Sequence, residues 1–76
     1  MAPLCAYRTF DYRSLKLNDF RDFETKLPGI VRDASSGVEI HGLSWAIGPR
    51  NVFVVVRVRD QDDLATLVLN DWSIDQ

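Results

Sequence analysis

The chain has 76 residues, one cysteine and a net charge of −2. That length fits one small domain, and the acidic balance argues against a nucleic-acid binder, which usually needs a basic surplus to neutralise phosphates. With 46% hydrophobic and 26% charged residues, the composition is that of a globular protein. We expect no signal peptide, and no apolar run is long enough to span a bilayer. We therefore expect one cytoplasmic domain over residues 1–76, without a disulfide or a cysteine-based zinc site.

The first half of the chain predicts a strand followed by a helix. Residues 4–12, LCAYRTFDY, are rich in aromatic and β-branched side chains, as strands are. Asn18 is suited to cap a helix, in which apolar residues recur at helical spacing: Phe20, Phe23, Leu27, Ile30, Val31 and Ala34. Pro28-Gly29 interrupts this stripe, because proline removes a backbone hydrogen bond. We expect a kink there, or a helix that stops near Lys26 and restarts before Ser35-Ser36-Gly37 ends it.

The second half predicts a hairpin and a second helix. Residues 38–47, VEIHGLSWAI, and residues 52–59, VFVVVRVR, have the composition of strands, and GPRN at 48–51 supplies the turn between them. Asp60 to Asp62 are suited to cap a helix, whose apolar positions are Leu64, Ala65, Leu67, Val68 and Leu69. A fourth strand near Trp72 is left open, because too few residues remain there to decide.

This order of elements predicts a ferredoxin-like α+β fold: an antiparallel sheet, β-α-β-β-α with an optional last strand, and two helices on one face. Residues 37–70 also share a pattern with known proteins: Gly42, Trp45, Ile47, Gly48, the valine run 52–56, and Asp60. This pattern resembles the middle of the GYD-type proteins of the dimeric α+β barrel superfamily. It departs from them at Pro49-Arg50-Asn51, where they usually carry an acidic residue, an aromatic residue and an aspartate. The resemblance implies the same fold and a homodimer paired sheet to sheet, without supplying a mechanism.

Alternation along the hairpin predicts which side chains point away from the helices, onto what we call the open face of the sheet. We assign Val52, Val54, Val56 and Val58 to the helix side. Strict alternation over residues 38–47 adds Val38, Ile40, Gly42, Ser44 and Ala46 to that side. The open face then holds Glu39, His41, Leu43, Trp45, Ile47, Phe53, Val55, Arg57 and Arg59, joined by Tyr7 if the first strand has the matching phase. A face this apolar predicts an interface or a ligand-binding surface.

Each prominent residue of this face has a structural role that competes with a functional one. Packing in a dimer or core accounts for Trp45 and Phe53 better than ligand stacking does. His41 is suited to act as a base, but no motif surrounds it, so a solvated role is favoured. Arg57 and Arg59 are suited to bind a carboxylate or phosphate, but such a pair more often keeps a strand end soluble or pairs with carboxylates such as Glu39, and that role is favoured.

The sequence supports three functions, of which the first is favoured. It is a non-catalytic homodimeric domain that binds a protein partner or small ligand through the open face, with no cofactor or metal. The second is a phage-type inhibitor or immunity protein that binds a foreign protein. The third, by analogy of fold alone, is a cofactor-free monooxygenase or isomerase with His41, Tyr7 and Arg57 around an apolar pocket. RNA binding as in RRM domains shares the strand order, but the glycine-aromatic signature is missing from the third strand.

Overall fold

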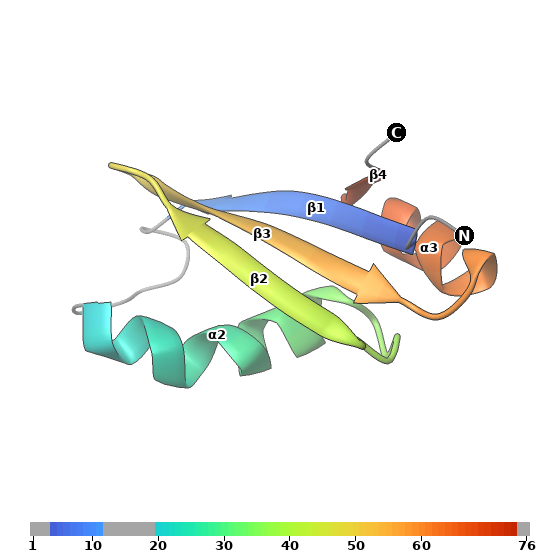
Figure 1. Ribbon diagram of the computed structural model, residues 1–76, viewed down its shortest axis with the longest axis horizontal. Helices are drawn as coiled ribbons and strands as arrows, with labels where there is room; N and C mark the ends of the chain where they lie inside the picture. The colour runs from blue at the N-terminus through green and yellow to red at the C-terminus, as the bar shows by residue number, and fades with distance from the viewer. Residues whose placement is uncertain (1–3, 12–19, 75–76) are drawn as a thin grey trace.

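The computed structural model describes residues 4–11 and 20–74, with the backbone alone over 20–24. These residues form a β-α-β-β-α-β chain: β1 (Leu4–Asp11), α2 (Phe20–Ala34), β2 (Gly42–Ile47), β3 (Asn51–Val58), α3 (Gln61–Leu69) and β4 (Ser73–Ile74). The strands make one antiparallel sheet in the order β2-β3-β1-β4 (Figure 1). The predicted ferredoxin-like fold is confirmed, including the fourth strand that the sequence left open.

A single core lies between the sheet and the two helices. β3 supplies the four valines that alternation assigned to the helix side, and they are 0–4% exposed. Leu27 and Val31 of α2 and Leu64 and Leu67 of α3 are buried against the same cluster, with Ala6, Phe10 and Trp72. Each valine or leucine buried in this way stabilises the fold by about 1.5–3 kcal/mol. Both helices therefore cover one face of the sheet, and neither covers the other face.

Helix α2 runs through Pro28 without a break, so the predicted stop near Lys26 is wrong. Pro28 is exposed, while Leu27 and Val31 on either side of it are buried against the sheet. Their packing holds both halves of the helix in place although one backbone hydrogen bond is missing. The helix ends at Ala34, directly before the predicted terminator Ser35-Ser36-Gly37, where the φ angles of Ser36 and Gly37, 53° and 83°, reverse the chain. The predicted cap at Asn18 lies outside the described residues.

Strand β2 begins at Gly42, four residues later than predicted. Residues 38–40 are not part of a strand. Val38 instead donates its N–H to the carbonyl oxygen of Ser35, at 3.0 Å. His41 donates its N–H to the carbonyl of Arg57 at 2.8 Å, and Gly42 is the register partner of the same arginine. His41 and Gly42 thus both lie opposite Arg57, and two residues of one strand opposite a single residue of the other are the arrangement of a β-bulge.

The C-terminal part of the chain is fixed by polar contacts to the rest of the molecule. Asp60 caps α3 as predicted, because its Oδ1 accepts the N–H of Asp63 at 3.0 Å. The Trp72 indole N–H donates to the carbonyl of Ala34 at 3.0 Å, and Arg8 donates to the carbonyl of Asn70 at 2.9 Å. These contacts hold β4 beside β1. Over the described residues, no helix has the length and apolar character needed to cross a membrane.

Candidate functional site

The register of β2 against β3 decides which side chains reach the open face. Residues directly opposite in an antiparallel pair point to the same side of the sheet. Leu43 pairs with Val56, Trp45 with Val54, and Ile47 with Val52. Because these valines are buried beneath the helices, Leu43, Trp45 and Ile47 lie on the helix-covered side. Their predicted position on the open face is therefore wrong.

The bulge at His41 and Gly42 is the physical reason for this correction. Val38 and Ile40 pack against the core, as strict alternation predicted. Beyond the bulge the phase shifts by one residue, so Leu43 rather than Gly42 continues the helix side. A Cβ placed on Gly42 would lie 3.3 Å from the Cβ of Arg57, which confirms that Gly42 faces the open side.

The open face that results has an aromatic centre. Tyr7 and Phe53 stack across β1 and β3 with ring centroids 5.4 Å apart and an interplanar angle of 38°. The register of β1 confirms the predicted side for Tyr7, which pairs with Val55. Around Tyr7, Phe53 and Val55 lie mainly small side chains, at Cys5, Thr9, Gly42, Ser44, Ala46 and Ser73. Phe53 remains 39% exposed, so the centre of this face is apolar and open.

Within the strands, the open face carries two charged side chains, at opposite ends. Asp11 pairs in register with Asn51 at one end, and Arg57 pairs with Cys5 at the other. One guanidinium nitrogen of Arg57 donates to the carbonyl oxygen of His41 at 3.5 Å, which lays the side chain over Gly42. Arg59 is exposed beyond the last residue of β3. The face is thus apolar in the middle and oppositely charged at its two ends.

Glu39 and His41 lie on the side of residues 38–41 that faces away from α2, as predicted, because Ile40 between them packs against the core. Their side chains form a pair, with 3.7 Å between His41 Nε2 and Glu39 Oε2, and both are well exposed to solvent. Tyr7 stacks on Phe53, while His41 lines a groove that includes neither Tyr7 nor Arg57. The enzymatic alternative, which needs His41, Tyr7 and Arg57 around one apolar pocket, stays a prediction. Among the described residues, no group of three or more histidine, cysteine or acidic side chains could hold a metal.

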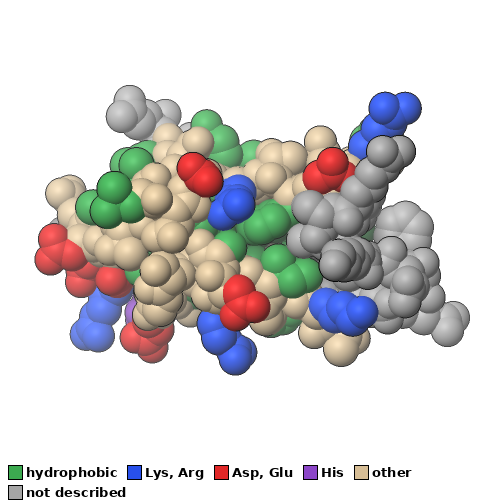
Figure 2. Space-filling view, turned by 180° about the vertical axis from the view of Figure 1, so that it is seen from behind, with side chains coloured by type: hydrophobic (Ala, Val, Ile, Leu, Met, Phe, Trp, Pro, Cys, Tyr) green, Lys and Arg blue, Asp and Glu red, His purple; other side chains and the backbone are tan. Residues whose placement is uncertain are grey.

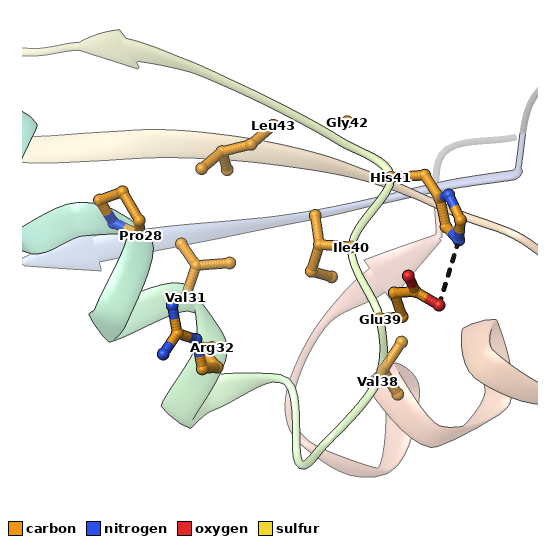
Figure 3. Close-up of a pocket in the computed structure, with 9 residues that line it drawn as sticks. All are labelled: Pro28, Val31, Arg32, Val38, Glu39, Ile40, His41, Gly42 and Leu43. Atoms are coloured by element: carbon orange, nitrogen blue, oxygen red, sulfur yellow. Dashed lines mark ion pairs between the residues drawn. The ribbon is translucent and has the colours of Figure 1, made fainter.

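A groove of about 530 Å³ runs between α2 and residues 38–43. Figure 3 shows Val31, Ile40 and Leu43 directed toward the space between the helix and this segment, with Pro28 and Arg32 on the helix wall. Glu39 and His41 turn away from the helix to the outer side of the segment. The sequence prediction missed this groove. The available signal was Gly42, because a glycine inside an apolar strand pattern often marks a bulge, and Gly42 lines the groove.

On the face seen in Figure 2, basic side chains do not gather into one patch. In the view of Figure 2, Lys and Arg side chains alternate with Asp and Glu side chains, and apolar side chains lie between them. This distribution differs from the basic stripe that marks a phosphate-binding surface. Compared with protein-family models, curated proteins and solved structures, the chain matches none. Its resemblance to the GYD-type proteins stays a prediction.

Proposed function

We propose that this chain is a non-catalytic binding domain that forms a homodimer by packing its open face against that of a second copy. The observation that carries the proposal is the uncovered aromatic centre of the sheet. Tyr7, Phe53 and Val55 occupy the middle of a face that neither helix covers. On an antiparallel sheet that is packed on one side only, the other side is normally polar. An apolar centre there is typical of an interaction surface.

The size of the face favours a second sheet as its partner. β1 and β3, with eight residues each, are about 26 Å long, while β2 has six residues and β4 two; at about 4.8 Å between neighbouring strands, the sheet has a plane of about 380 Å². A stable interface buries about 800 Å² of accessible surface on each partner. A pleated face with side chains exposes more than its plane area, but almost all of it must be covered to reach that value. A flat partner of equal extent achieves this, since two sheets pack face to face at about 10 Å.

The charges favour a copy of the same chain. A twofold axis that crosses the strands in the plane of the interface brings the Arg57 end of each copy to the Asp11 end of the other. Opposite charges then meet at both rims, while the two aromatic centres meet in the middle. The resemblance to GYD-type proteins supports the same sheet-to-sheet pairing, and a single cysteine is in keeping with the cytoplasmic location expected from the sequence.

The test is the solution mass, measured by light scattering after size exclusion. Wild type is expected at twice the chain mass of 8.7 kDa, and Phe53→Glu at the chain mass, because the new charge would be buried in the interface. Val68→Glu is the matched control: Val68 is an apolar residue of α3 with 44% exposure against 39% for Phe53, and it should leave the dimer intact. A monomeric wild type overturns the proposal and directs the open face toward a foreign protein. Equal dissociation of both variants overturns the assignment of the interface.

A further inference from the structure

We propose that the groove between α2 and residues 38–43 binds an extended peptide, which adds as a strand along this edge of the sheet. The peptide presents an apolar side chain to the groove, and a glutamate two residues away from it pairs with Arg32. This surface is separate from the open face, because its floor is made by Ile40 and Leu43 on the helix side of the sheet. The inference therefore goes beyond the homodimer and does not depend on it.

The backbone along this edge offers hydrogen-bonding groups to a new strand. β2 is the last strand on its side of the sheet. Gly48 donates its N–H to the carbonyl of Asn51, and bonded pairs alternate along an antiparallel ladder, so the N–H and C=O of Leu43 point away from β3. Within the described residues, the N–H groups of Glu39 and Ile40 also have no backbone acceptor. A row of such groups is the feature that an extended peptide recognises.

The side chains of the groove define the apolar part of the ligand. Val31 is 2% exposed, and Ile40 and Leu43 pack against the core next to it. In Figure 3 these side chains converge from the helix and from the edge segment, with Pro28 above Val31. The volume of about 530 Å³ accommodates one or two side chains of a strand that lies along the edge. We expect a branched aliphatic side chain at the central position, since its neighbours are aliphatic.

Arg32 defines the charged part of the ligand. Among the α2 side chains that the structure describes, it is the charged one that lines the groove, and no described carboxylate forms a salt bridge with it. Pro28 and Arg32 are one helical turn apart, which is about 6 Å along the helix axis. Strand residues two apart point to the same side, about 6.6 Å from each other. When the apolar residue of the peptide lies near Pro28, the peptide residue two positions away therefore lies near Arg32. A glutamate at that position forms a charge-assisted hydrogen bond with the arginine.

The probe is the acetylated and amidated peptide TETVTET, titrated into isotope-labelled protein and followed by amide chemical shifts. Its symmetry puts a glutamate two residues from the valine in both strand directions. We expect saturable shifts at Ile40, Leu43 and Val31, and weaker binding of TKTVTKT than of TETVTET. Arg32→Glu should weaken the glutamate peptide about tenfold and strengthen the lysine peptide by a similar factor. Arg50→Glu, the same charge change in the turn between β2 and β3, should leave both affinities unchanged.

Backbone methylation of the peptide separates strand addition from simple occupation of an apolar groove. One peptide carries N-methyl groups on its threonines and the other on its glutamates and valine. Because alternate N–H groups of a strand point to the same neighbour, only one of the two peptides should lose binding. Equal binding of both overturns strand addition and indicates a ligand held by side chains alone, as a small aliphatic carboxylate would be. Absence of shifts at millimolar peptide overturns the site.

The titration is repeated with Phe53→Glu, so that failure of the groove and failure of the dimer can be told apart. Peptide shifts at Ile40 and Leu43 in both proteins support the groove whatever the oligomeric state. Shifts confined to Tyr7 and Val55 overturn it, because they place the peptide on the open face. Concentration-dependent shifts at Leu43 in Phe53→Glu without peptide also overturn it, since a second copy then occupies the edge.

Discussion

β3 and β2 are neighbours in one sheet and face the same helix layer, yet they bury their side chains to different degrees. The four valines of β3 that face the helices are 0–4% exposed, whereas Trp45 and Ile47 on the same side of β2 are 41% and 48% exposed. β3 has a strand on both sides, and β2 has one on a single side. The described helices therefore close over the middle of the sheet and leave its edge partly open.

This difference separates a stabilising region from a binding region within one hairpin. The side chains of β3 on the helix side are fully enclosed, so they contribute to the core and are closed to a partner. β2 combines partly exposed apolar side chains with backbone N–H and C=O groups that point away from β3. It lies next to the groove lined by Val31, Ile40 and Leu43. A small domain can present two surfaces in this way, one on the sheet face and one on the sheet edge, from the same two strands.

The largest effect is expected from a charge on the enclosed side of β3. Val54→Asp places a carboxylate at a position with no exposure, where an unpaired charge costs several kcal/mol. A single core of this size supplies about 3–5 kcal/mol of stability, so the variant should lose its far-ultraviolet circular dichroism signal. Phe53→Asp, one residue earlier on the open face, should stay folded as a monomer. Folding of both variants to the same stability would contradict the assignment of the two faces.

A moderate effect should distinguish β3 from β2 within one register pair. Val52 is fully buried and its partner Ile47 is 48% exposed. Val52→Ala removes two buried methyl groups and leaves a cavity, so we expect the free energy of unfolding to fall by about 2–3 kcal/mol. Ile47→Ala removes more carbon atoms but should lower it by only about 1 kcal/mol. Urea denaturation at low protein concentration measures both, and a larger loss for Ile47→Ala would contradict the comparison.

The same comparison explains which parts of the fold the sequence predicts. On a central strand both neighbours and one helix layer enforce strict alternation, so the valines of β3 were placed correctly from their spacing. Asp60 was identified as a cap because that role needs only a side-chain oxygen and the next turn of backbone. Of the two alternatives at Pro28, the stop near Lys26 was wrong because local propensity predicts a break, whereas the packing of Leu27 and Val31 depends on a sheet that is distant in sequence.

The candidate site was predicted only where no long-range shift intervenes. Tyr7, Phe53, Val55 and Arg57 do share the open face. Leu43, Trp45 and Ile47 were misplaced because the bulge moves their phase by one residue, and both phases of VEIHGLSWAI are equally apolar. Gly42 was the local signal of that bulge. The position of the bulge became clear only because both His41 and Gly42 lie opposite Arg57, which is fifteen residues after Gly42 in the chain.

The smallest effect is expected in the segment that leads into β2. His41 and Glu39 form an exposed pair, and such pairs contribute about 0–1 kcal/mol because water screens both charges. His41→Ala keeps the backbone N–H that bonds to Arg57, so the bulge and the phase of β2 should persist. We expect the unfolding free energy to change by less than about 0.5 kcal/mol, with Glu39→Ala as the matched partner variant. A loss well above that for His41→Ala alone would mean that the imidazole, rather than the backbone, holds the bulge in place.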